Sequence, residues 1–170
     1  MQRKILEEII SKQGERESLA YIIDTENGDE FIFSRGKKTN YPELDMEIND
    51  CLKSDRSKLV QIDNKNFFID VYNHPLKLLI IGAVHIAQHL INFANNLNFD
   101  CILIDPREGF ANKERFADVK IYNSWPDEVL PELGIDERTA VVTLTHDPKI
   151  DDVALDYAVS YTHLRAHETL

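Results

Sequence analysis

A glycine-containing turn directly after an apolar run is the first place where this sequence could bind a ligand. Residues 82–87 read Gly-Ala-Val-His-Ile-Ala, and a dinucleotide-binding turn has the pattern G-x-G-x-x-G/A. Gly82 and Ala87 fit the first and third positions, whereas the branched side chain of Val84 would crowd a pyrophosphate. Asp105 ends the next apolar run, where a ribose-binding carboxylate is expected. The pattern fits either a variant nucleotide turn or a domain of the same shape that binds no dinucleotide.

Two histidines follow apolar runs that are far apart in the sequence. His85 falls in the first turn of an expected helix, where the helix dipole disfavours a protonated imidazole. A neutral His85 could contact a ligand or a metal, or could simply bond to its own loop. His146 belongs to the polar segment 145–152, Thr-His-Asp-Pro-Lys-Ile-Asp-Asp. The aspartates of this segment could orient the histidines or cap the next helix.

Basic residues accompany these turns in an otherwise acidic chain. Arg107, Lys113 and Arg115 follow the second apolar run, and Lys149 follows the fourth. Charge-assisted hydrogen bonds from such a cluster would suit a phosphate-bearing ligand. Surface ion pairing with Glu108 and Glu114 is the alternative.

The apolar pattern from Leu76 onward predicts the elements that position these residues. Continuous apolar runs are typical of parallel strands buried on both faces, and their alternation with helical segments predicts a doubly wound sheet. If the strand order is 3-2-1-4, the carboxyl ends of the first and fourth strands bring His85 and His146 to one crevice. We expect strands at residues 78–81, 101–104, 119–122 and 139–144, and helices at 85–97 and 126–133 and from 152 to 159.

The N-terminal part has a different pattern. Asn27-Gly28 favours positive φ at both turn positions and predicts a β-hairpin. We expect strands at 19–23, 30–33, 58–62 and 66–72 and helices at 2–13 and 42–53. The chain is thus predicted to be an α/β protein: a Rossmann-like parallel sheet (74–159), incomplete at its C-terminus, preceded by a small α+β domain (1–73).

The last residues, 160–170, continue neither pattern, so we expect a truncated reading frame with a non-native tail; a native terminus is the alternative. An open strand edge at this end predicts self-association, and hence a possible homo-oligomer.

Composition limits the partners and the compartment. The net charge of -11 over 170 residues argues against binding of DNA or RNA. Cys51 and Cys101 form no metal-ligand motif and no disulfide framework, and Cys101 is expected inside a buried strand. The N-terminus lacks the pattern of a signal peptide, and no apolar run approaches the roughly 20 residues of a membrane span. We therefore expect no membrane partner and a cytoplasmic location.

Several motifs, in order, resemble the XdhC/CoxI family over residues 66–159. Residues 79–88 are similar to the family's Rossmann turn, with valine at the second glycine position, and residues 104–111 to its second-strand motif. The matches continue at Glu114-Arg115-Phe116, Trp125-Pro126-Asp127-Glu128, 136–142 and 144–152.

The resemblance implies an accessory protein rather than a catalyst. Members of the family bind molybdenum cofactor (molybdopterin), assist its sulfuration with a cysteine desulfurase, and help to insert it into xanthine dehydrogenase-type molybdenum hydroxylases. Two departures matter: the family's next strand with its Gly-Ser-Arg turn is missing, and so is the Gly-Gly-Cys segment of many longer members. An NAD(P)-binding oxidoreductase on the same fold is the alternative, and a regulatory domain that binds only a partner protein is a third interpretation.

We choose the candidate cofactor-binding residues by their position in the expected fold. We expect arginines near the phosphate of the cofactor and His146 near its metal end. They are Gly82, Val84, His85, Asp105, Arg107, Arg115, Thr145, His146, Asp147 and Lys149.

Overall fold

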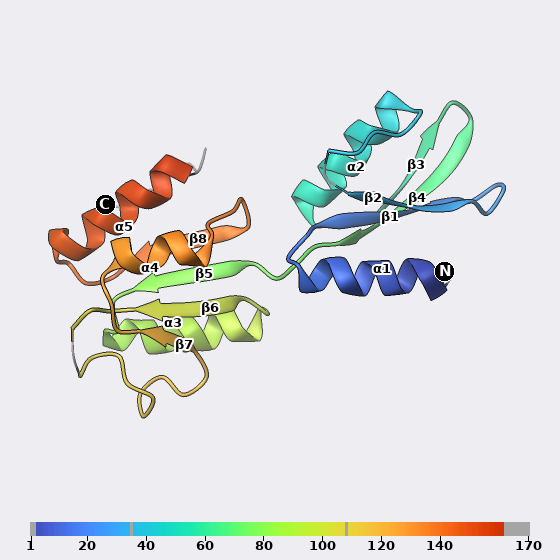
Figure 1. The fold of residues 1–170 in the computed structure, drawn as a ribbon. Helices are drawn as coiled ribbons and strands as arrows, with labels where there is room; N and C mark the ends of the chain where they lie inside the picture. Colours follow the sequence, from blue (N-terminus) through green and yellow to red (C-terminus); the bar gives the residue numbers. More distant parts are fainter. Residues whose placement is uncertain (1–2, 35, 108, 162–170) are drawn as a thin grey trace. The chain divides into compact units, whose positions relative to one another are not determined.

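The chain forms two compact units, Met1–His74 and Pro75–Leu170, seen in a computed structural model that describes residues 3–34, 36–107 and 109–161 (Figure 1). Each unit has its own four-stranded sheet and its own core. Within the described residues, no helix has both the length and the apolar character needed to cross a membrane.

The N-terminal unit is an antiparallel sheet between two helices. Its strands are β1 (Leu19–Asp24), β2 (Glu30–Ser34), β3 (Lys58–Ile62) and β4 (Lys65–Tyr72), in the order β2-β1-β4-β3. Helices α1 (Arg3–Gly14) and α2 (Pro42–Ser54) cover opposite faces (Figure 1). Phe33, Leu44 and Ile69 belong to the core under α2, and Ile9 and Tyr21 to the smaller core under α1.

Two turns of this unit differ from the predicted ones. Only Gly28 of the Asn27-Gly28 pair has positive φ (+78°), because the turn closes through a hydrogen bond from the Gly28 N–H to the Asp24 carbonyl. The second hairpin turns at Asp63 and Asn64, with φ of 49° and 63°, so β4 begins at Lys65 rather than at Asn66. Positive φ at both central residues matches the right-handed twist of the flanking strands.

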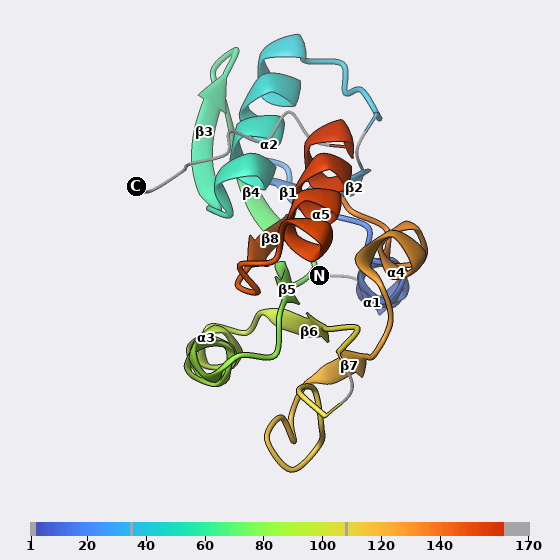
Figure 2. The same ribbon diagram turned by 90° about the vertical axis from the view of Figure 1, so that its left-hand side faces the viewer.

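The C-terminal unit is the predicted parallel sheet. Its strands are β5 (Lys77–Ile81), β6 (Asp100–Ile104), β7 (Lys120–Tyr122) and β8 (Thr139–Thr143). Their order, β7-β6-β5-β8, is the predicted 3-2-1-4 arrangement, with β5 and β8 as parallel neighbours. Helix α3 (His85–Asn96) covers one face, and α4 (Pro126–Leu133) and α5 (Pro148–Tyr161) cover the other (Figures 1 and 2).

Two expectations about this unit were wrong in detail. Strand and helix do not alternate throughout, because the described residues between β6 and β7 form no helix. Helix α5 begins at Pro148 rather than at Asp152. Its start is fixed by Asp147, whose carboxylate accepts the Lys149 N–H at 3.0 Å and whose carbonyl accepts the Asp151 N–H at 2.9 Å. Of the predicted non-native tail (160–170), Ser160 and Tyr161 form the end of α5, and residues 162–170 lie outside the described part of the chain.

A buried lysine joins α4 to the sheet. Lys77 is 5% exposed, and its Nζ donates to the carbonyls of Leu133 at 2.6 Å and Gly134 at 2.8 Å. These carbonyls end α4 and have no partner within the helix. The ammonium therefore satisfies the helix terminus and also complements its negative dipole end.

Both cysteine side chains are buried. Cys101 is 7% exposed within β6, as predicted, and Cys51 is 3% exposed on the inner face of α2. Burial raises the pKa of both thiols. Neither side chain presents a thiolate at the surface near neutral pH.

Candidate functional site at the carboxyl edge of the parallel sheet

The turn between β5 and α3 requires glycine at its first position. Gly82 has a φ of +113°, and a Cβ there would lie 2.8 Å from Cγ2 of Thr145. Its N–H donates to the Ile104 carbonyl at 2.8 Å. The turn after β5 is thus packed directly against the segment after β8, as the predicted strand order requires.

Asp105 joins the turn after β5 to the loop after β6. Its carboxylate is fully buried and accepts four hydrogen bonds. The Ala83 N–H donates at 2.7 Å, the Arg107 N–H at 3.0 Å, and the Arg107 guanidinium at 2.9 Å through Nε and 2.7 Å through Nη2. Burial by itself would raise the pKa of Asp105, but the hydrogen bonds from Arg107 and Ala83 outweigh it and hold this pKa below its usual value.

Arg107 presents a fixed cation beside this turn. Its guanidinium packs over the Phe110 ring, 4.4 Å from the centroid, and its side chain is 32% exposed. The pKa of Arg107 is raised chiefly by Asp105, with smaller contributions from Asp147 and Asp151. Those contributions place the segment after β8 within electrostatic reach of Arg107. Residues from three separate loops therefore meet at one edge of the sheet.

Asp151 organises the segment after β8. Its carboxylate accepts the Thr145 hydroxyl at 2.6 Å and the His146 N–H at 2.9 Å. The Thr145 hydroxyl oxygen in turn accepts the Asp147 N–H at 3.0 Å. These bonds hold His146 at a φ of +58°, a left-handed conformation that is uncommon outside glycine. Of the roles open to the aspartates, Asp147 therefore caps α5 and Asp151 fixes the loop.

The histidines lie at the ends of two different helices. His85 is exposed at the start of α3, and its ring makes an edge contact with His89, 5.0 Å between centroids. His146 is exposed before α5. Within the described residues, no group of three or more His, Cys, Asp or Glu side chains is placed to hold a metal ion.

The other predicted cations differ in their surroundings. Arg115 turns back on its own loop, where Nη1 donates to the Phe110 carbonyl at 2.8 Å and the guanidinium lies over Phe116. Lys149 is exposed in the first turn of α5, and Lys113 is exposed in the loop after β6. Of the two expected ion-pair partners, Glu108 lies outside the described residues and Glu114 is exposed. Arg107 is tied through Asp105 to the turn that precedes α3, and the Arg115 carbonyl accepts a hydrogen bond from Gln88 Nε2 of α3 at 3.0 Å.

The start of α3 offers donors for an anion. Val84 is the N-cap residue and makes no side-chain hydrogen bond to the first turn. Backbone N–H groups of an uncapped first turn point out of the helix, where the dipole also favours negative charge. Sequence reasoning identified Asp105 and Arg107 but missed the Ala83 N–H and the Phe110 ring as their partners. The signal that could have shown Ala83 and Asp105 to be neighbours is the predicted strand order, because it makes the strands that precede them adjacent.

The fold and the polar residues at the carboxyl edge of the sheet define a Rossmann-type domain. In sheets of this kind, ligands bind at the carboxyl edge, where the strand order reverses. Comparison with known families identifies this domain further: residues 78–167 match the XdhC Rossmann domain, and the chain belongs to that family.

One similar solved structure is a protein from Bacillus halodurans described as a xanthine dehydrogenase. The TM-score is 0.63 at 18% sequence identity, with 91% of this chain covered. The chain corresponds to only 46% of the length of that protein. This likeness supports the fold over both units. No curated protein matches the chain significantly.

Proposed function

We propose that the chain is an accessory protein that binds molybdenum cofactor and assists its sulfuration and insertion into xanthine dehydrogenase-type molybdenum hydroxylases. Membership of the XdhC Rossmann domain family is the observation that carries this proposal. The protein acts as a carrier and not as a catalyst, and the cofactor is its cargo. The proposed binding site is the carboxyl edge of the parallel sheet, around Gly82, Asp105, Arg107 and Thr145.

The cargo is a pterin with a phosphate, and the residues of the edge suit an anion of this kind. The Arg107 guanidinium, held by Asp105 beside the turn that begins α3, would contact the phosphate together with the first-turn N–H groups. Lys149 and His146 stand exposed on the neighbouring segment, where His146 would face the metal end. Each role requires only a side chain that is already at the surface.

Two features of the edge argue against the alternative, an NAD(P)-binding oxidoreductase. A ribose-binding carboxylate needs an oxygen that can accept from the sugar hydroxyls. Both oxygens of Asp105 already accept hydrogen bonds from Ala83 and Arg107. Val84 also brings a branched side chain to the position where dinucleotide turns have glycine. A carrier of a different phosphate-bearing ligand is therefore the better interpretation.

Sulfuration would require a sulfur donor from outside the chain. The sequence has two cysteines, and both thiols are buried with raised pKa values. A persulfide that transfers sulfur needs an accessible, low-pKa cysteine. We therefore assign the sulfur-transfer step to a cysteine desulfurase partner, while this chain holds the cofactor in place.

Anaerobic equilibrium titration of the purified chain with molybdenum cofactor tests the proposal. We expect saturable binding that His146→Ala and Arg107→Ala weaken and that excess NADH leaves unchanged. Displacement of the cofactor by NADH would favour the oxidoreductase alternative. Absence of binding to a chain that unfolds cooperatively would contradict the carrier function of this chain.

A second assay tests the later steps. The loaded chain is mixed with a cysteine desulfurase, cysteine and an apo-form molybdenum hydroxylase, and hydroxylase activity is followed. Activity that depends on both the desulfurase and the chain is expected. Equal activation by free cofactor at the same concentration would contradict an accessory role.

A further inference from the structure

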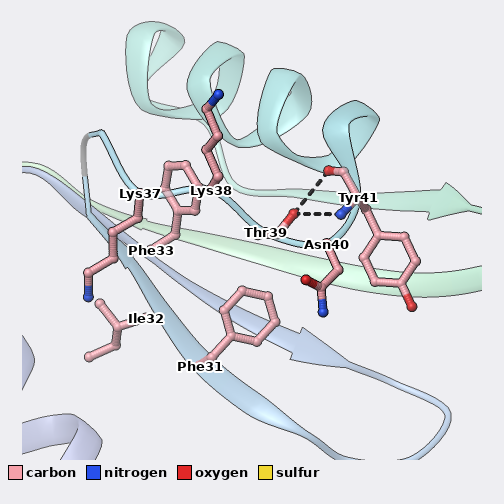
Figure 3. Close-up of a pocket in the computed structure, with 8 residues that line it drawn as sticks. All are labelled: Phe31, Ile32, Phe33, Lys37, Lys38, Thr39, Asn40 and Tyr41. Atoms are coloured by element: carbon pink, nitrogen blue, oxygen red, sulfur yellow. Dashed lines mark hydrogen bonds between the residues drawn. The ribbon is translucent and has the colours of Figure 1, made fainter.

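A separate cavity lies within the N-terminal unit, at the outer edge of β2. It measures about 270 Å³ and is lined by β2 and by the segment that leads into α2 (Figure 3). The lining residues are Phe31, Ile32, Phe33, Lys37, Lys38, Thr39, Asn40 and Tyr41. All of them belong to one stretch of chain, so the cavity is complete within this unit.

Two aromatic rings form its walls. Phe31 is half-buried on β2, and Tyr41 is half-buried at the N-cap of α2. The Tyr41 ring packs against Phe67 with centroids 5.5 Å apart, and its hydroxyl accepts a hydrogen bond from Lys65 Nζ at 3.1 Å. A ring held in this way offers a preformed apolar surface for a flat ligand.

The segment between these walls is held in place by its own hydrogen bonds. The Thr39 N–H donates to Asp45 Oδ1 at 2.8 Å, and the Thr39 hydroxyl donates to the Tyr41 carbonyl at 2.9 Å. This leaves the Asn40 side chain between the Phe31 and Tyr41 rings (Figure 3). A carboxamide presents a donor and an acceptor side by side, the arrangement that reads the edge of an adenine-type heterocycle.

A cation stands at the end of the cavity. The Lys37 ammonium extends beside Ile32, whereas the Lys38 ammonium points away along α2 (Figure 3). Within the described residues Lys37 forms no ion pair, and the nearby Glu17 is already paired with Lys12 at 2.7 Å. In a chain with a net charge of -11, this local positive charge favours an anionic group at that end.

We propose that this cavity binds a heteroaromatic ring that carries a phosphate, with the ring against Phe31, its polar edge on Asn40 and its phosphate on Lys37. Adenine mononucleotides and phosphorylated pterins share this chemistry. The cavity is distinct from the polar edge of the parallel sheet and does not depend on the carrier function proposed above.

Titration of the full-length chain by calorimetry and by amide chemical shifts tests the proposal, with adenosine 5′-monophosphate and a pterin phosphate ester as probes. Adenosine and inorganic phosphate are the comparison ligands. We expect saturable binding of at least one probe, weaker binding of the comparison ligands, and shifts at residues 31–33 and 39–41. The tighter of the two probes identifies the source of the ligand.

A matched pair of lysine variants sharpens the test. Lys37→Gln should weaken probe binding about tenfold, because it removes one charge-assisted contact. Lys38→Gln should change it less than about twofold. Both positions are exposed, so the fold is retained and thermal unfolding verifies this.

Three results would overturn the inference. The first is the absence of saturable binding at millimolar probe, and the second is equal binding by the Lys37 and Lys38 variants. The third is a set of shifts confined to residues 82–85 and 105–107, which would assign the probe to the parallel sheet and leave the carrier proposal intact. If the chain bound no molybdenum cofactor but this inference held, the probes would still shift the amide signals of residues 39–41.

Discussion

The two sheets of this protein gather polar residues in different ways. In the antiparallel N-terminal sheet, successive strands end at opposite edges, and its cavity is lined by two short neighbouring segments, residues 31–33 and 37–41. In the parallel C-terminal sheet, the strands end at one edge, so Ala83, Asp105 and Thr145 meet although they are remote in sequence. A site of the first kind depends on local chain geometry. A site of the second kind depends on the whole sheet being assembled.

This difference explains why the parallel edge needs a buried polar connector. Its loops come from separate strands and have no local turn to hold them together. Asp105 supplies the connection through Ala83 and Arg107, whereas the bonds of Asp151 fix the segment after β8 internally. Fully satisfied buried networks of this kind rigidify a site, whereas partly satisfied ones are costly.

The largest effect is expected from Asp105→Ala. The change removes a fully buried carboxylate and leaves the Ala83 N–H and the Arg107 guanidinium without their acceptor. Breaking a buried ion pair from one side should lower the free energy of unfolding by about 3 kcal/mol. Urea denaturation measures this, with the exposed Asp118→Asn as control. A loss below about 1 kcal/mol would show that Asp105 is no connector.

A pair of glycine substitutions compares the two regions directly. Gly82→Ala combines positive φ with a Cβ 2.8 Å from Thr145 Cγ2, and should cost about 2–3 kcal/mol. Gly28→Ala has positive φ and open space, and should cost about 1 kcal/mol. Adding Thr145→Ser to Gly82→Ala should recover part of the loss, because it removes Cγ2 and keeps the hydroxyl. Equal costs at the two glycines would contradict the close packing of the β5 and β8 loops.

Replacing the buried lysine of β5 should have an intermediate effect. Lys77→Met leaves the Leu133 and Gly134 carbonyls without their donor, which should cost about 2 kcal/mol. Thermal or urea unfolding measures the change, and the exposed Lys113→Met is the control. If Lys77→Met were as stable as Lys113→Met, the prediction would be contradicted, because water would then satisfy the two carbonyls as well as the ammonium does.

The smallest effect is expected from pH. The pKa of Asp105 is lower in the folded chain than its usual value of about 3.9, so its contribution to stability is fully present above pH 4. The contribution is lost as the pH falls through the folded pKa. Between pH 6 and pH 3, the wild type should therefore lose more free energy of unfolding than Asp105→Asn does. Parallel pH profiles for the two proteins would contradict the lowered pKa.

Much of the parallel sheet was predictable because its strands are continuous apolar runs and its turns follow them directly. The predicted strand order is the observed one. The approach of Thr145 to Gly82 and the hydrogen bond from Ala83 to Asp105 follow from that order. The start of α5 was missed because Asp147 and Pro148 were assigned to a loop, although together they form an N-cap and first turn. The Arg107–Phe110 contact and the direction of Arg115 depend on side-chain rotamers, which periodicity does not encode.

The cavity beside β2 was not predicted, and its elements show why. Helix and hairpin patterns predicted β2 and α2, but the cavity lies in the connection between them. Its shape depends on how Thr39 bonds to Asp45 and Tyr41, a local arrangement with no periodic signature. Sequence alone thus predicted the sheet edge that topology assembles and did not predict the cavity that a loop builds.

The most direct test of the central claim is anaerobic titration of molybdenum cofactor into the wild type, Arg107→Lys and the exposed control Arg56→Lys. Lysine keeps the charge of Arg107 but loses its forked guanidinium, so we predict binding about tenfold weaker for Arg107→Lys and unchanged for Arg56→Lys. Equal affinity in all three folded proteins would contradict the assignment of the cofactor to the carboxyl edge of the parallel sheet.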